Sequence, residues 1–496
     1  MNLKNSGKER RGKDNFPRIA CEFMKILFIT PEAQPFFSTG GLAEVSGGLP
    51  KALRKKRAGC RVVMPLYQDI APALREKLRF VTEVTVPVAW RRQYCGVFEA
   101  RLGGVIYYLL DNEYYFKRPG AYGYYDDAER FAFLSRAALE ILPLVGYKPD
   151  IIHANDWQTA LAPVYYSRLY ANAPGYEGIK TVFTLHNMQY QGEYGKELLG
   201  EVVGIDEKDG ALLEYNGNLN LLKGGIECAD AVTTVSPSYA REILDPWFSH
   251  GLDPFLRQRE WKISGILNGI DTEVYDPSAD GDIAESYSAG DISGKAACKV
   301  ALQEEFGLPV NPETPLFAMV TRLTGHKGLD LFKPVLYDFL GGTDAQIIVL
   351  GSGDTEYEEF FKRAREDFPG KVGLYLGFNP GLSHRVYAGA DLFLMPSKSE
   401  PCGLSQMIAL RYGTVPVVRA VGGLKDTIVD ATAGEGNGFT FQSYNAHDML
   451  DAIRRALEVY ARPEDWHALI QRGMACDFSW NASAREYLGL YKGLTA

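Results

Sequence analysis

Short apolar runs alternate with longer segments of helical spacing from Met24 to the end of the chain. The runs are rich in β-branched and aliphatic residues, and this alternation is typical of βαβ units and parallel sheets. In the first half, the predicted strands span residues 26–30, 61–64, 105–110, 150–153, 181–185 and 231–235. Helical spacing marks residues 129–142 and 158–170, whereas 80–88 and 94–101 predict an antiparallel insertion.

The same alternation starts again after Asp271. Four prolines between residues 277 and 315 interrupt it, which predicts a linker and a surface loop. The strands predicted beyond them span residues 316–320, 346–350, 372–376, 392–395 and 415–418. The predicted helices lie near residues 329–339, 357–367, 382–388 and 404–412. We therefore expect an α/β fold with two doubly wound domains and a cleft between them, facing the carboxyl ends of both sheets.

Length and composition agree with this expectation. The chain has 496 residues, and one hydrophobic core rarely serves more than about 250–300 residues. Hydrophobic residues make up 46% and charged residues 23%, as in ordinary globular proteins. A formal net charge of −9 argues against a nucleic-acid partner, because binding to the phosphate backbone requires a basic surface. No run approaches the roughly 20 apolar residues of a membrane-spanning helix, so no membrane partner is expected.

The cysteines and the N-terminus predict a cytoplasmic location. Seven cysteines are scattered without a C-x-x-C pair or zinc-ligand spacing, which predicts reduced thiols and no metal site. Residues 1–23 are polar and basic and lack the apolar stretch of a signal peptide. We expect them to form a disordered tail, and Met24 is an alternative start.

A glycine pair, Gly40-Gly41, follows the first predicted strand and precedes a helix. Glycines at such a place let backbone N–H groups approach a phosphate at the positive end of the helix. The alternative is a tight turn that requires positive φ. The spacing is not G-x-G-x-x-G, so the nicotinamide-cofactor fingerprint is absent.

Polar side chains also end two later strands of the first half. His153, Asn155, Asp156 and Trp157 follow one strand, and His186 follows the next. The carboxyl ends of parallel strands border the ligand crevice of an open α/β sheet. The alternatives are that Asp156 caps the next helix and that His186 is a hydrogen-bonded structural residue.

In the second half, Arg322 and Lys327 bracket Gly325 between a strand and a helix. A loop there would fold both cations onto one diphosphate, with Arg322 as a planar fork and Lys327 as a point charge. The alternative is a pair of solvated surface cations.

A last polar stretch, SEPCGLSQ at 399–406, joins an apolar strand to a helix. Glu400 is expected to point into the cleft, and the N–H groups around Gly403 to face an anion. The alternative for Glu400 is a first-turn carboxylate favoured by the helix dipole. Cys402 has no histidine nearby in sequence, so we expect it to form part of the wall.

Together these motifs resemble the bacterial glycogen synthase and plant starch synthase family, from about Met24 to the end of the chain. The motifs that carry the resemblance are STGGLAEV at 38–45, HANDWQTAL at 153–161, TLHNMQYQG at 184–192, TTVSPSYA at 233–240, LNGID at 267–271, TRLTGHKGLD at 321–330 and SEPCGLSQ at 399–406. The resemblance implies a retaining glucosyltransferase that transfers glucose from ADP-glucose to the non-reducing end of an α-1,4-glucan such as glycogen. It implies no metal and no cofactor.

The resemblance also implies two Rossmann-like domains of the GT-B type. An acceptor-side domain would span 24–268, a nucleotide-sugar domain 269–476, and a helix in 477–496 would return to the first domain. His186, Glu400, Arg322, Lys327 and Asp156 would be catalytic, with the cations on the diphosphate and His186 and Glu400 on the glucose. Substrate contacts are expected from Ser38, Gly40, Gly41, Glu44, Asn187, Cys402, Gly403, Leu404 and Ser405.

Two positions depart from the family pattern. Ser38 stands where many relatives have Lys, which removes one cationic phosphate contact, and Glu44 stands where many have Asp. The E-x7-E pair of other two-domain glycosyltransferases is absent, because Ile408 lies eight residues after Glu400.

Three hypotheses remain open at the level of sequence. The first is an active glucan-extending transferase; the second, motivated by Ser38, is a non-catalytic or weakly active glucan-binding relative. The third is a glucan phosphorylase, which would require a pyridoxal-phosphate lysine that no motif singles out. The residues also leave open ADP-glucose against UDP-glucose, and front-face transfer against double displacement.

Overall fold

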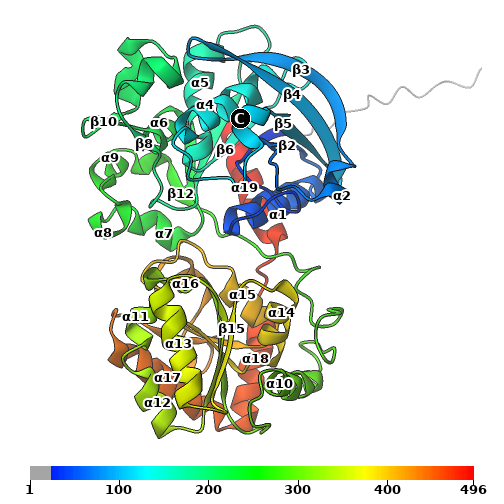
Figure 1. Cartoon of the computed structure of the whole chain (residues 1–496), viewed down its shortest axis with the longest axis vertical. Coiled ribbons are helices and arrows are strands. Elements are labelled where there is room, and N and C mark those ends of the chain that lie inside the picture. The colour runs from blue at the N-terminus through cyan, green and yellow to red at the C-terminus, as the bar shows by residue number, and fades with distance from the viewer. Residues whose placement is uncertain (1–23) are drawn as a thin grey trace, which may run out of the picture.

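The computed structural model describes residues 24–496, and the predicted N-terminal tail lies outside the described residues. Two α/β domains follow each other along the long axis of the molecule (Figure 1). The first is built on a nine-stranded sheet in the order β12-β11-β7-β6-β1-β2-β5-β4-β3. Its parallel strands are β1 (Lys25–Ile29), β2 (Gly59–Pro65), β5 (Val105–Asp111), β6 (Ile151–Asn155), β7 (Lys180–Leu185), β11 (Ala231–Thr234) and β12 (Ile263–Gly265).

The predicted antiparallel insertion forms the far edge of this sheet. β3 (Arg79–Val88) pairs antiparallel with β4 (Arg91–Leu102), which pairs antiparallel with β5. The helices of the first domain are α1 (Gly41–Lys55), α2 (Pro72–Arg75), α3 (Glu113–Phe116), α4 (Asp127–Glu140), α5 (Leu161–Tyr165), α6 (Leu221–Cys228), α7 (Pro237–Glu242), α8 (Pro246–Ser249) and α9 (Asp253–Arg257). A small separate sheet contains β8 (Glu193–Tyr194), β9 (Glu214–Tyr215) and β10 (Asn218–Asn220).

The second domain is a fully parallel six-stranded sheet in the order β15-β14-β13-β16-β17-β18. Its strands are β13 (Leu316–Val320), β14 (Gln346–Gly351), β15 (Val372–Leu376), β16 (Leu392–Met395), β17 (Val415–Arg419) and β18 (Phe439–Phe441). The helices are α10 (Ser293–Glu305), α11 (Leu329–Phe332), α12 (Leu336–Gly342), α13 (Thr355–Asp367), α14 (Pro380–Gly389), α15 (Ser405–Arg411), α16 (Gly422–Thr427), α17 (Ala446–Tyr460) and α18 (Pro463–Met474). Central strands such as β14 are buried throughout because helices cover both faces.

Two predicted helices are broken in the structure. The segment 329–339 is split into α11 and α12 around Pro334, which lacks the N–H that a continuous helix needs. The segment 158–170 consists of a 3-10 turn (Trp157–Thr159), α5 and a π-helical turn (Tyr166–Tyr170).

The last helix, α19 (Trp480–Thr495), packs against the first domain, where its red ribbon lies beside α1 in Figure 1. The Tyr491 hydroxyl lies 2.7 Å from Nδ1 of His153 on β6. A Cβ atom at Gly48 of α1 would lie 2.1 Å from Trp480 Nε1, so glycine permits the close approach of the two helices. Among residues 24–496, no helix is long and apolar enough to cross a membrane.

Candidate functional site

The glycine pair lies at the start of α1, beside a buried carboxylate. Glu32 accepts hydrogen bonds from both the N–H and the hydroxyl of Thr39, each at 2.7 Å. Burial raises the pKa of Glu32 to about 6, against the effect of these bonds. Gly40 has an extended φ of −178°, and neither Gly40 nor Gly41 has positive φ, so the tight-turn explanation is wrong. Ser38, Gly40 and Gly41 are exposed.

This loop and α1 face the second domain. A Cβ atom at Gly41 would lie 4.0 Å from Leu404 Cδ1, across the domain interface. Burial raises the pKa of Glu44 on α1 to about 7. The charge of Glu44 in turn contributes to raised pKa values of Tyr275 and Tyr387, for which burial is the main cause. Glu44 therefore lies among groups of the second half of the chain.

Asp156 and His186 form one hydrogen-bonded unit at the ends of β6 and β7. The Asp156 carboxylate accepts the backbone N–H of His186 at 2.7 Å, and the N–H of Asn187 also acts on it. Burial raises its pKa to about 7 and outweighs both bonds. Asp156 makes no capping bond and has φ of +56°, a strained conformation for this residue, so the capping explanation is wrong.

The tautomer of His186 follows from its neighbour Asn155. The Asn155 amide donates to Ile29 O at 3.0 Å, so its oxygen accepts from His186 Nε2 at 3.0 Å. Burial lowers the pKa of His186 to about 3, so the ring is neutral near pH 7. With Nε2 protonated, Nδ1 carries the lone pair.

His153 is not part of this group. It is fully buried between β7 and α19, with Nε2 2.6 Å from the Thr184 hydroxyl and Nδ1 facing Tyr491. Burial, and secondarily the charge of His186, lowers its pKa to about 3. His153 therefore ties the sheet to the last helix.

The loop of the second domain that carries Arg322 and Lys327 contacts Glu400 through Lys327. Lys327 Nζ lies 2.7 Å from Glu400 Oε2, which also accepts from the Ser397 hydroxyl at 2.9 Å. Glu400 is buried, and Arg322 is exposed with no carboxylate paired to it among residues 24–496. Burial lowers the pKa of His326, and the charges of Lys327 and Arg322 lower it further, so both cations act on one ring.

The side chain of Gln406 stabilises the turn that precedes α15. Gly403 has φ of +71°, and Gln406 Nε2 donates to the carbonyls of Cys402 at 3.1 Å and Gly403 at 2.9 Å. Burial raises the pKa of Cys402 to about 12, so its thiol is neutral and forms part of the wall. α15 begins at Ser405, five residues after Glu400, so the first-turn explanation for Glu400 is wrong.

The structure groups the predicted residues on two facing domains. On the first lie Ser38, Gly40, Gly41, Glu44, Asp156, His186 and Asn187. On the second lie Arg322, Lys327, Glu400, Cys402, Gly403, Leu404 and Ser405. The sequence did not single out Glu32 and Tyr122 as candidate residues, although both lie near Asp156. Burial raises the pKa of Tyr122, and the charges of Glu32 and Asp156 raise it further. Only the fold brings these three residues together.

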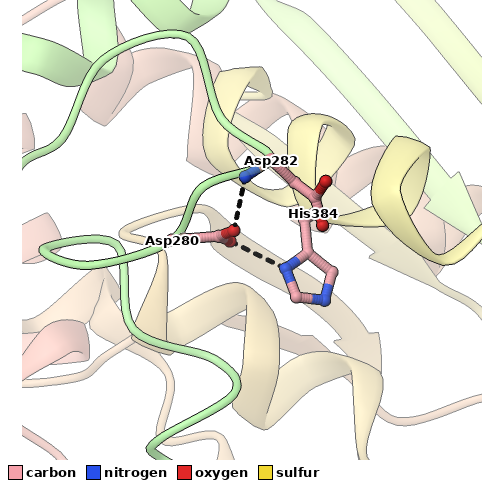
Figure 2. A group of neighbouring side chains, drawn as sticks. All are labelled: Asp280, Asp282 and His384. Carbon is pink, nitrogen blue, oxygen red and sulfur yellow. Dashed lines mark hydrogen bonds and ion pairs between the residues drawn. The ribbon is translucent and has the colours of Figure 1, made fainter.

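One group of metal-type donors occurs among residues 24–496, and none of its members is a predicted site residue: Asp280, Asp282 and His384 (Figure 2). Asp280 Oδ2 accepts from His384 Nδ1 at 2.7 Å and from the Tyr412 hydroxyl, and Oδ1 accepts the N–H of Asp282 at 2.9 Å. These bonds outweigh the effect of burial and lower the pKa of Asp280. Hydrogen bonding thus accounts for the cluster, which fastens the linker to α14 and α15.

Comparison with known proteins places the chain, over most of its length, in one family. Residues 25–258 match the starch synthase catalytic domain, and residues 302–473 match glycosyl transferases group 1. The chain is 49% identical to a glycogen synthase of Geobacillus thermodenitrificans, over 95% of this chain and 98% of that protein. It is 47% identical to a glycogen synthase of Bacillus cereus, over 95% of this chain and all of that protein.

Solved structures agree. The catalytic domain of Starch Synthase IV from Arabidopsis thaliana, bound to ADP and acarbose, matches with a TM-score of 0.88 and 34% identity, over 95% of this chain and 99% of that chain. A sucrose-phosphate synthase from Thermosynechococcus elongatus, at 17% identity, shares the fold with a TM-score of 0.60 over 95% of this chain and 99% of that chain. The chain therefore belongs to the glycogen synthase and starch synthase family of glycosyltransferases, with the two Rossmann-like domains of the GT-B fold.

Proposed function

We propose that this protein is a glycogen synthase that transfers glucose from ADP-glucose to the non-reducing end of an α-1,4-glucan, with retention of configuration. The observation that carries the proposal is the pairing of two half-sites. Neutral His186 and Asp156 end strands of one sheet, and Arg322, Lys327 and Glu400 follow strands of the other. A cytoplasmic location remains part of the proposal.

The leaving diphosphate would lie between the glycine loop and the two cations. The C1–O bond to phosphate breaks as negative charge builds on the diphosphate, and Arg322 and Lys327 stabilise that charge. Lys327 is already held by Glu400 at 2.7 Å, so its position is fixed before the substrate arrives. The N–H groups of Gly40 and Gly41 would add uncharged donors.

The glucose would lie beside His186 and Glu400. Positive charge develops at C1, and a neutral imidazole bonds to a sugar hydroxyl without repelling that charge. The acceptor O4 forms the new bond to C1, and its proton passes to the departing phosphate oxygen on the same face. Retention then needs no separate base, metal or cofactor.

The contacts of Lys295 bear on the phosphorylase alternative. This lysine is buried with a pKa lowered to about 7, chiefly by burial. Its amino group donates to Ala388 O, Tyr412 O and the Thr414 hydroxyl. The amino group thus has three hydrogen-bond partners within the protein, which disfavours Lys295 as the lysine of a pyridoxal-phosphate Schiff base.

The test is a parallel assay of the purified protein with ADP-glucose, UDP-glucose and glycogen. Nucleotide release and chain growth are measured together, and growth from ADP-glucose is expected to exceed growth from UDP-glucose. No turnover with either donor would contradict the proposal and favour the glucan-binding relative. Phosphate-dependent release of glucose-1-phosphate would favour a phosphorylase.

A further inference from the structure

A short helix of the first domain, α8, contacts the second domain. Its Phe248 packs against an apolar cluster of the second domain. That cluster consists of Leu410, Val418, Val421, Leu424 and Ile428. The preceding residue, Trp247, is 66% exposed. In Figure 1, α8 lies at the edge of the first domain that is nearest to the second, so this helix is part of the contact between the domains.

Trp247 contacts the loop that carries Glu400. Nζ of Lys398, two residues before Glu400, lies 5.4 Å from the centre of the Trp247 ring and 5.7 Å from the centre of the Tyr444 ring. Both distances are within the range of a cation–π interaction, about 6 Å. Among residues 24–496, Lys398 forms no ion pair, so these two rings are the partners of its charge. The ammonium group therefore contacts one aromatic ring of each domain.

Backbone hydrogen bonds connect Lys398 to the cations of the candidate site. Its N–H donates to the carbonyl of His326, next to Lys327, at 2.8 Å. Its own carbonyl accepts from the Arg419 guanidinium at 2.7 Å, and this guanidinium lies 5.2 Å from the Tyr444 ring. A displacement of Lys398 would therefore also displace the loop that carries Lys327.

On the first domain, Gln191 connects α8 to the loop that begins at His186. The Gln191 side chain is buried, and its Nε2 donates to Met188 O at 3.2 Å and to His250 O, just after α8, at 3.1 Å. Its Oε1 accepts from Asn220 Nδ2 at 2.6 Å. A buried amide with partners on both its atoms fixes the segments that it joins. The end of α8 and the loop of His186 are therefore held together.

We propose that Trp247 and Lys398 are positioning residues for glucosyl transfer, an inference that rests on the proposed function. Their contact holds the loops of Lys327 and Glu400 in a fixed place relative to His186. Transfer needs the sugar and the diphosphate to be held correctly at the same time, and a misplacement of about 1 Å can lower a rate about a hundredfold. Trp247 and Lys398 act on the reaction through the segments to which they are joined.

The test is a double-mutant cycle in the full chain: Trp247→Leu, Lys398→Met and both together, assayed with ADP-glucose and glycogen. Each single substitution removes one side of the cation–π contact, so kcat should fall about fivefold, and the double variant should lose no more than either single variant. The KM for ADP-glucose should change by less than about twofold, because the cations that bind the donor remain. Lys398→Arg keeps a cation over the ring and should retain kcat to within about twofold.

Trp261→Leu is the matched control. Trp261 is 80% exposed, and Lys262 Nζ lies 5.6 Å from the centre of its ring in the same kind of contact. This variant should keep the kcat of the parent protein. Losses of kcat that multiply in the double variant would overturn the inference, and so would a lower Tm with an unchanged kcat in Trp247→Leu.

Tryptophan emission tests the contact without any turnover. The field of a nearby charge shifts the emission of an indole, so Lys398→Met should change the emission spectrum of the parent protein and leave that of Trp247→Leu unchanged. No change, or the same change in both proteins, would overturn the inference. A change that depends on Trp247 in a protein that turns over neither donor would contradict the proposed function and leave the contact established.

Discussion

At the scale of single residues, the candidate site places carboxyl groups where burial opposes their charge. Asp156 has a pKa raised from 3.8 to about 7, while the backbone N–H of His186 binds its carboxylate at 2.7 Å. His186 is held neutral by the same burial. Residues of this kind reduce stability in return for a prearranged site, which is a common property of active sites.

Asp156→Asn should change how stability depends on pH. Between its ordinary pKa and about 7, folded Asp156 keeps a proton that the unfolded chain has lost. The free energy of unfolding therefore falls as pH rises through this window, by up to about 1.4 kcal/mol per pH unit for one group. Urea unfolding at pH 5, 6 and 7 should show a shallower fall in the variant, and Asp338→Asn, on an exposed face of α12, should keep the full slope. An identical slope in Asp156→Asn would refute the assignment.

Glu400→Gln should lower turnover far more than stability. The substitution removes the charge that holds Lys327 at 2.7 Å, so the cation loses its fixed position toward the diphosphate. We expect kcat to fall about a hundredfold, with a small change in Tm. Glu305→Gln removes a carboxylate paired with Arg385 at 2.8 Å outside the site and serves as the control. Equal effects of the two substitutions on kcat would make Glu400 structural.

At the scale of elements, hydrogen bonds join α7 of the first domain to α16 of the second. Ser238 donates its N–H and hydroxyl to Asp426 at 2.7 and 2.6 Å, and Glu242 accepts the N–H of Gly422 at 2.8 Å. The next N–H, of Gly423, donates to Glu400 O at 3.1 Å. The contact between the domains is therefore connected directly to the backbone of Glu400.

Asp426→Ala should weaken this contact between the domains, because it removes the acceptor of both Ser238 hydrogen bonds. Hydrogen bonds to a charged group contribute about 1.5–3 kcal/mol, so this contact between the two domains should be less populated and kcat should fall about tenfold. Small-angle scattering should show a larger radius of gyration, whereas Asp451→Ala, an exposed partner of Arg455 on α17, should change neither quantity. A reduced Tm with an unchanged kcat and an unchanged radius of gyration would show that the α7–α16 contact only stabilises the fold.

The sequence predicted the elements that carry strong patterns and missed the rest for physical reasons. The long apolar strands are found within a residue or two, as for β1 at Lys25–Ile29. Three-residue strands such as β12 and β18 are too short to show a period. Strand-end residues such as Asp156 were recognisable from their position, but Tyr122 meets Asp156 and Glu32 only because distant segments fold together.

At the scale of the whole molecule, the chain crosses between the domains twice. It leaves the first domain after β12 and returns as α19, where Ser483 donates to Leu267 O at 2.6 Å. An ion pair between Lys55 and Glu273, at 2.7 Å, lies on the exposed surface and contributes little. The packing of α19 on α1 therefore contributes more than this ion pair to holding the end of the chain on the first domain.

Gly48→Ala should weaken the packing of α19 on α1. The added Cβ would lie 2.1 Å from Trp480 Nε1, and overpacking of this kind costs about 1–3 kcal/mol. The urea midpoint of the variant should fall. Gly489→Ala on α19 meets no atom within 4 Å and should leave the midpoint unchanged or raise it through better helix propensity. An unchanged midpoint in Gly48→Ala would mean that α19 lies elsewhere in solution.

The return of α19 also sets the order in which the protein is completed during synthesis. The first sheet ends at Gly265, but the helix that covers His153 and Gly48 begins at Trp480. At about 5–20 residues per second, the ribosome needs on the order of ten to forty seconds to make the intervening chain. Throughout that interval the newly made first domain lacks the cover of Trp480, Tyr487 and Tyr491, so this face of the nascent chain stays open to other chains until the last helix emerges.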